Sequence, residues 1–153
     1  MNKKIPSLSF FDFRKSQGPD LEFEFDPENF DPATIAECPG IYIFRTRDRA
    51  TFNYPAGNSP IIYIGMSENL RHRLSEHRRT FRKVYENPEY GMDKGKWISS
   101  EYHYMAAHRV TAYIYYIRQT QEAKTMESTA LWQFYCKYHS LPVGNGAKSF
   151  PKF

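Results

Sequence analysis

A histidine and an arginine share one face of the first long helix that the sequence predicts. Four apolar residues in 68–85 recur at helical spacing and predict a buried stripe: Leu70, Leu74, Phe81 and Val84. His77 falls inside this stripe, and Arg73 lies four residues earlier on the same face. An imidazole in this setting is a candidate for catalytic proton transfer. A histidine that is simply hydrogen-bonded in the core is the more common occupant of such a position, and the sequence leaves both interpretations open.

A carboxylate lies in the middle of the apolar stripe of a second predicted helix, residues 121–139. Glu127 shares that stripe with four other residues: Ala123, Leu131, Phe134 and Tyr138. An ionised carboxylate is costly among apolar neighbours unless something compensates it. Three compensations stay open, namely a buried ion pair with a residue such as Arg73, a raised pKa, or a divalent metal ion.

Two tyrosines lie in segments that are typical of strands. Tyr42 belongs to residues 40–45 and Tyr63 to residues 61–65, and both segments are rich in isoleucine. If these strands pair, the two phenols converge near the start of the first long helix, whereas ordinary packing in the sheet is the alternative. Residues 46–60 between them are polar and predict a hairpin with a long, mobile loop.

The elements that must position these residues give a mixed fold. Ser67 is the predicted cap of the first long helix. The pattern also predicts an edge strand at 21–25, a short helix at 32–37 and a further strand at 110–117. Residues 86–107 are predicted to be irregular, with one helical turn near their end, and residues 141–146 form a turn-rich tail. We therefore expect an α/β (α+β) protein with a small central three-stranded antiparallel sheet flanked by helices.

Charge divides the chain into an acidic leader and a basic body. The 153 residues fit one compact domain, residues 39–153, preceded by an N-terminal extension, residues 1–38. The extension carries four basic and eight acidic side chains, whereas the body carries 17 basic and nine acidic ones. Such a body favours a polyanionic partner, with nucleic acid first, although a soluble protein with a patchy surface is the alternative.

The outer face of the first long helix is the clearest basic surface in the sequence. It carries five residues that are candidates for contact with a nucleic-acid backbone: Arg71, Arg78, Arg79, Arg82 and Lys83. A solvated helix face explains the same residues without a partner. The acidic leader either lies across such a surface as an internal competitor or docks its phenylalanines on the sheet, which we favour.

Several classes of protein are excluded. No apolar run approaches the ~20 residues that a membrane span requires. The lysines at the N-terminus are not followed by the apolar block of a secretory signal. Cys38 and Cys136 are too few for a disulfide framework or a four-ligand zinc site. These features favour a cytoplasmic protein without membrane partners.

The candidate residues, taken together, resemble a known set. Gly40-Ile41-Tyr42 followed by Tyr63-Ile64-Gly65 is similar to the signature of the GIY-YIG nuclease superfamily. The resemblance covers roughly residues 40–146 and extends, in the family's order, to the positions Arg73, His77, Glu127 and Asn145. The long gap between the two tyrosine motifs, the segment 86–107 and the acidic leader depart from the family's minimal core.

This resemblance implies a stand-alone, metal-dependent endonuclease that hydrolyses phosphodiester bonds, most simply in duplex DNA. It implies that Glu127 holds Mg²⁺ or Mn²⁺ and that Arg73 binds the scissile phosphate. Tyr42 would take a proton from water, with Tyr63 and His77 positioning or sharing that proton, and Asn145 would brace the site. The alternatives are a nucleic-acid-binding module that has lost cleavage and a domain that uses this fold for another ligand.

Overall fold

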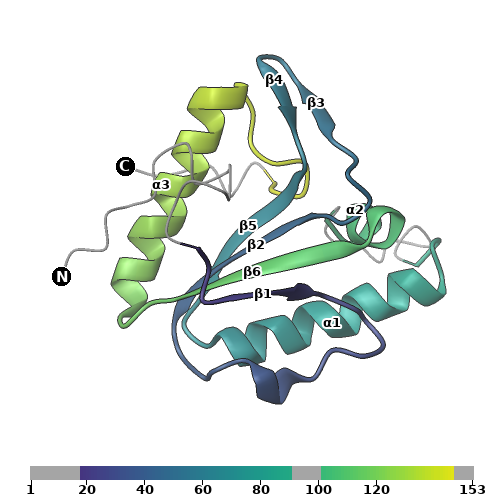
Figure 1. Ribbon diagram of the computed structural model, residues 1–153, viewed down its shortest axis with the longest axis vertical. Coiled ribbons are helices and arrows are strands. Elements are labelled where there is room, and N and C mark those ends of the chain that lie inside the picture. Colours follow the sequence, from purple (N-terminus) through teal and green to yellow (C-terminus); the bar gives the residue numbers. More distant parts are fainter. Residues whose placement is uncertain (1–17, 91–100, 147–153) are drawn as a thin grey trace.

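A four-stranded antiparallel sheet forms the centre of the computed structural model, which describes residues 18–90 and 101–146 (Figure 1). Its strands are, in spatial order, β1 (Leu21–Glu24), β6 (Val110–Tyr116), β2 (Gly40–Thr46) and β5 (Ile61–Ser67). The described helices are α1 (Leu70–Glu86), α2 (Glu101–His108) and α3 (Thr120–Tyr138), and α1 and α3 cover opposite faces of the sheet. The predicted α+β class is confirmed, but the prediction of three strands in this sheet is wrong.

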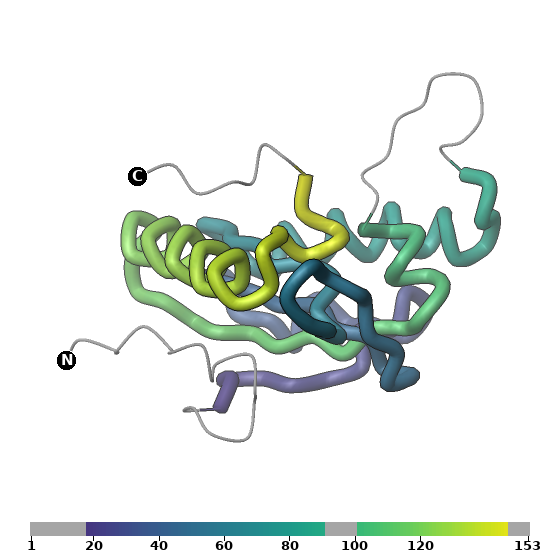
Figure 2. Tube along the Cα trace, turned by 90° about the horizontal axis from the view of Figure 1, so that it is seen from above, coloured from purple at the N-terminus to yellow at the C-terminus, as the bar shows by residue number. Residues whose placement is uncertain are grey.

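The additional strand comes from the N-terminal extension. β1 pairs antiparallel with β6 and so covers backbone groups that would otherwise lie unpaired at the sheet edge. Phe25 and Phe30, which follow β1, are buried in the core under α1, and the Phe25 ring stacks on Phe44 with 5.3 Å between centroids. The docking interpretation of the leader is thus confirmed for residues 18–38, and residues 1–17 lie outside the described chain. Figure 2 shows β1 as the outermost strand.

The sheet separates two apolar cores. In β2, Ile41 and Ile43 face α3, whereas Tyr42 and Phe44 face α1. The pairing of β2 with β5 shifts register after Phe44, so β5 carries one extra residue at that point. As a result Ile62 and its neighbour Tyr63 both pack on the α1 side. Tyr63 pairs with Phe44, two residues from Tyr42 and before the shift, so Tyr42 and Tyr63 approach the same helix from adjacent strands.

The stripe predicted for α1 is confirmed, but its cap is not the predicted residue. The buried residues of α1 are the four predicted apolar residues and His77. Asn69 is the N-cap, and its side chain accepts a hydrogen bond from the backbone N–H of His72 at 3.1 Å. Ser67 instead donates from its hydroxyl to the Asn69 carbonyl at 2.9 Å. The predicted cap was wrong because the helix begins two residues later than the pattern indicates.

The remaining predictions succeed in part. The predicted loop 46–60 contains a two-stranded sheet, formed by β3 (Phe52–Tyr54) and β4 (Gly57–Ser59), which Figure 1 shows beside the C-terminal end of α3. Tyr54 fixes this hairpin, because its ring packs on Phe134 and its hydroxyl accepts a hydrogen bond from the Val143 N–H at 3.0 Å. The short predicted helix is a 3-10 turn, Pro32–Thr34. Of the predicted irregular segment, residues 91–100 lie outside the described chain.

Candidate active site

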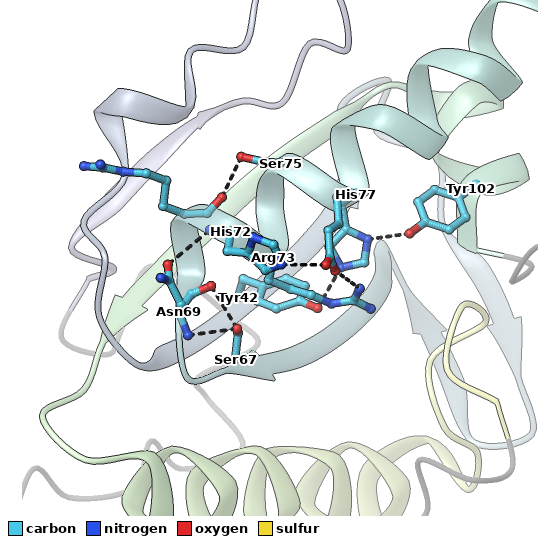
Figure 3. Close-up of polar contacts among 10 residues, drawn as sticks. Tyr42, Ser67, Asn69, His72, Arg73, Ser75, His77 and Tyr102 are labelled. Carbon is cyan, nitrogen blue, oxygen red and sulfur yellow. Dashed lines mark hydrogen bonds and ion pairs between the residues drawn. The ribbon is translucent and has the colours of Figure 1, made fainter.

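The hydroxyl of Tyr42 is the centre of a buried polar cluster between β2 and α1 (Figure 3). It lies 2.7 Å from Nε2 of His77, and the Arg73 guanidinium hydrogen-bonds the same phenol. The ring of Tyr63 stacks on that of Tyr42 with 5.9 Å between centroids. The fold therefore brings together four of the residues that the sequence analysis selected, and one turn of α1 supplies two of them.

Gly65 has no side chain and so leaves space for the rings of Tyr42 and Tyr63. A Cβ at this position would lie 2.5 Å from the Tyr42 hydroxyl oxygen and 2.6 Å from Cε1 of Tyr63, well inside contact distance. The backbone of β5 is thus approached closely by both rings, which is a setting in which a strand requires glycine. The last residue of the second tripeptide acts sterically, by admitting the tyrosines.

His77 is buried and neutral. Burial, and next the nearby Arg73 charge, lower its pKa to about 3. Its Nδ1 lies 2.8 Å from the Tyr102 hydroxyl, so both ring nitrogens have a phenol as partner. The two interpretations that the sequence left open are not exclusive, because this histidine is satisfied in the core and also bonded to a candidate catalytic group.

Both tyrosines of the motif are neutral phenols in the free protein. Burial raises the pKa of Tyr42 well above its usual range, while the Arg73 guanidinium acts in the opposite direction. Burial also raises the pKa of Tyr63, and the charge of Glu101 adds to that shift. Proton uptake by either oxygen therefore requires that the phenol first gives up its own proton.

Glu127 enters the site from the opposite face, on α3. It is half-buried, and burial raises the pKa of its carboxyl, with the backbone amide of Met66 acting in the opposite direction. The charge of Glu127 contributes to the raised pKa of Tyr63. Arg73 forms its ion pair with Glu76 at 2.9 Å, and none of the ion pairs within residues 18–90 and 101–146 includes Glu127. Of the compensations left open by the sequence, the raised pKa is present and the pair with Arg73 is not.

Two residues of α2 belong to the cluster and were missed from the sequence. Tyr102 bonds His77, and Glu101 is only 3% exposed. Oε2 of Glu101 has no hydrogen-bond partner in the described part of the chain, and burial raises the pKa of this carboxyl. The sequence offered little signal for either residue, because one predicted helical turn is too short to show an apolar face.

Asn145 lies against the backbone of β5. Its Oδ1 accepts from the Ile64 N–H at 3.0 Å and its Nδ2 donates to the Ile64 carbonyl at 2.8 Å. The side chain thus replaces a neighbouring strand at the free edge of the sheet, one residue from Tyr63. Two hydrogen bonds thus join Asn145 to this strand, and the bracing role that the resemblance implies stays a prediction.

The five basic residues predicted for the outer face of α1 are not equivalent. Nε of Arg71 donates to the Ile35 carbonyl at 2.7 Å, and Nε of Arg78 donates to the Pro27 carbonyl at 3.1 Å. These two residues therefore hold the N-terminal segment against the helix. The others have different surroundings: Arg82 is paired to Glu86, Lys83 lies over the ring of Tyr90, and Arg79 is exposed.

The donors available for a metal are few. Within the described residues, no three His, Cys, Asp or Glu side chains come together as a metal site. Mg²⁺ accepts such a setting, because it keeps most of its waters and binds through one or two carboxylates together with phosphate oxygens. The half-buried, unpaired carboxyl of Glu127 fits an ion of that kind.

Comparison with known proteins gives no relative. The chain matches no protein-family model, and no curated protein or solved structure is significantly similar to it. No helix among the described residues has the length and apolar character needed to cross a membrane. A functional assignment therefore depends on the geometry of the site.

Proposed function

We propose that this chain is a metal-dependent endonuclease of the GIY-YIG type, which hydrolyses phosphodiester bonds in nucleic acid, most simply duplex DNA. The observation that carries the proposal is the buried contact of 2.7 Å between Tyr42 and His77, with Arg73 bonded to the same phenol. A proton acceptor on β2 is thus brought to its partner and to a cation for phosphate, both of which come from one turn of α1.

Arg73 is the residue proposed to bind the scissile phosphate. Its side chain is 35% exposed, so the guanidinium reaches solvent while it also contacts Tyr42. A guanidinium fork matches two phosphate oxygens and neutralises charge in the transition state. A phosphate bound there also offsets the positive charge that helps to lower the pKa of His77, so substrate binding makes the imidazole a better proton acceptor.

The proton of the attacking water is proposed to move to Tyr42. Because this phenol is neutral, its own proton must leave as the new one arrives, and Nε2 of His77 is 2.7 Å away to accept it. Tyr63 lies alongside and orients the reacting groups through its hydroxyl. Asn145 keeps Tyr63 in place through the backbone of the adjacent Ile64.

Glu127 is the residue proposed to hold Mg²⁺ or Mn²⁺. Such an ion, when bound, supplies charge neutralisation at the phosphate and supports the leaving oxygen. Because the pKa of Glu127 is raised, a proton competes with the metal ion for its carboxylate. Metal binding should therefore weaken as the pH falls.

Relaxation of supercoiled plasmid tests the proposal. We expect nicking or linearisation with Mg²⁺ and none with EDTA, and Glu127→Gln should lower the rate by about 10³-fold or more because the charge that holds the ion is lost. Glu122→Gln is the matched control, since it changes the same group at an exposed position of α3. Salt-dependent DNA binding without cleavage by the unaltered chain would instead support the binding-module alternative.

A further inference from the structure

His77 lies between two phenols that come from different parts of the fold. Tyr42 on β2 meets Nε2 at 2.7 Å, and Tyr102 on α2 meets Nδ1 at 2.8 Å. Figure 3 shows Tyr102 approaching the imidazole on the side away from Tyr42. All three side chains are buried, with His77 at 0% exposure. Solvent therefore does not replace either partner.

The proton of this imidazole must be assigned to one nitrogen. A neutral imidazole has a single N–H, so one nitrogen donates and the other accepts. Phenols do both, so the two tyrosines alone leave the choice open. Arg73 favours one of the two choices, because the positive charge of its guanidinium attracts the lone pairs of the Tyr42 oxygen and turns the Tyr42 proton away from itself. The Tyr42 proton is then directed to Nε2, and the proton of His77 lies on Nδ1.

We propose that Tyr102 is a positioning residue for the endonuclease reaction proposed above: its oxygen holds the His77 proton on Nδ1 and so keeps Nε2 free to accept the proton of Tyr42. The inference rests on that proposed function for its kinetic consequence alone. A histidine held in one tautomer by the partner of its other nitrogen is a known requirement of acid–base sites. Here a neutral phenol takes that place.

The position of Tyr102 is itself fixed. Its hydroxyl also hydrogen-bonds the side chain of Thr80, one turn along α1 from His77, and its ring is almost fully buried. If the Tyr102 hydroxyl is removed, the Nδ1–H of His77 faces an apolar ring without an acceptor, which is costly in a buried site. The imidazole avoids this cost by moving its proton to Nε2, where it donates to Tyr42 and no longer accepts.

Two measurements on Tyr102→Phe test this assignment. Nitrogen-15 NMR of histidine-labelled protein without nucleic acid should show His77 protonated on Nδ1 in the unaltered chain and on Nε2 in the variant. Its signals are identified by their absence from His77→Gln. In plasmid cleavage, kcat should fall about 10- to 100-fold with KM unchanged, as for other residues that orient a ligand or base. Because an unfolded neutral histidine also carries its proton mainly on Nε2, the variant must show a cooperative unfolding transition like that of the unaltered chain before its tautomer is compared.

Tyr104→Phe is the matched control. It deletes the same atom from the same helix, but its ring packs on Phe52, away from His77. It should leave the tautomer and the rate unchanged. If Tyr102→Phe does not fold, Thr80→Val is the variant that tests the proposal. It removes the hydroxyl that hydrogen-bonds Tyr102 and leaves the rings of Tyr102 and His77 unchanged. A partial shift of the proton to Nε2 with a smaller loss of rate supports the proposal, and an unchanged tautomer overturns it.

The remaining outcomes separate this inference from the endonuclease proposal. A proton on Nε2 in the unaltered chain, or one that stays on Nδ1 in Tyr102→Phe, overturns the role of Tyr102 whether or not the protein cleaves DNA. A proton that shifts as expected in a protein without any nuclease activity supports the coupling of Tyr102 to His77 and refutes the endonuclease function.

Discussion

On the α1 face of the sheet the buried phenols of Tyr42 and Tyr102 both bond His77, whereas Glu127 on α3 is half-buried and has no ion-pair partner in the described chain. Both faces place a polar side chain inside a helical apolar stripe. On the first, the bonds repay the loss of hydration, and the cluster contributes to stability as well as to the proposed chemistry. On the second, the half-buried carboxyl has the Met66 backbone amide as a partner but no positive charge paired with it in the described chain, which is more typical of a residue kept for function.

The contrast determines what substitutions report. A change in the bonded cluster affects folding and activity together, so its kinetic effect does not isolate a catalytic role. A change at Glu127 should affect activity almost alone. The difference can be measured in the free energy of unfolding, without any substrate.

The largest effect on stability is expected for His77→Leu. This change removes the partner of the Tyr42 and Tyr102 hydroxyls in a buried site, and we expect the free energy of unfolding in urea to fall by about 3 kcal/mol. Glu127→Gln should stay within about 1 kcal/mol of the unaltered protein. His72→Leu is the control, because His72 is an exposed histidine of the same helix. Equal losses for His77→Leu and Glu127→Gln would abolish the distinction between the two faces.

The next largest loss of stability is expected where Gly65 leaves space for the rings of Tyr42 and Tyr63. Gly65→Ala forces a methyl group against Tyr42 and Tyr63 and should cost about 1–3 kcal/mol of unfolding free energy. Gly146→Ala is the matched control, since a Cβ there meets no described atom within 4 Å. Thermal unfolding of both variants measures the difference. A Gly65→Ala protein as stable as the control would show that the rings move apart easily.

Much of this arrangement was predictable from the sequence. The periodicity of α1 located His77 in the buried stripe, and that of α3 located the other stripe residues, because each pattern is local and long, but Glu127 is only half-buried there. The strands that carry Tyr42 and Tyr63 were predicted for the same reason. Their side chains share a face because β2 and β5 pair with Tyr42 opposite Gly65 and Phe44 opposite Tyr63, a register that no local pattern reveals.

What the sequence did not predict depends on contacts between distant segments. The pairing of β1 with β6 joins residues about 90 positions apart, as in Leu21 opposite Ile114. Tyr102 and Glu101 reach the site through the packing of α2 against α1. Arg71 and Arg78 donate hydrogen bonds to backbone carbonyls of the leader. Each of these depends on tertiary contacts, which propensity and spacing do not specify.

Glu101 is a second carboxyl without an ion-pair partner in the described chain, more deeply buried than Glu127, and the pH dependence of stability can reveal its burial. Burial raises its pKa above the ordinary 4.5, so the folded chain holds this proton more tightly than the unfolded chain. The resulting stability is complete below about pH 4.5 and is lost as the pH rises through the folded-state pKa. We therefore expect Glu101→Gln to be more stable than the unaltered protein by about 1 kcal/mol at pH 8 and similar at pH 4. Urea unfolding at both values measures this, and a variant less stable at pH 8 would mean that the ionised carboxyl is paired.

The smallest effects separate two arginines on the outer surface of α1. Arg78 donates to carbonyls of Pro27 and Glu28, whereas Arg79 is exposed and takes part in no hydrogen bond or ion pair recorded among the described residues. If this surface meets DNA, Arg79→Ala should reduce the slope of log affinity against log salt by about one and leave the melting temperature unchanged. Arg78→Ala should instead lower stability slightly, by about 1 kcal/mol, because the leader loses an attachment.

Binding of a short duplex in EDTA, followed by fluorescence anisotropy at several salt concentrations, measures both slopes. Equal reductions for the two variants would mean that Arg78 leaves the leader when DNA binds, so that the acidic segment and the nucleic acid compete for one surface. No reduction in either variant would place the nucleic acid elsewhere on the molecule. A reduction confined to Arg79 fits the arrangement in which the leader is a fixed part of the fold, because the guanidinium of Arg78 is held against two backbone carbonyls of the leader and cannot turn towards a phosphate without breaking those bonds.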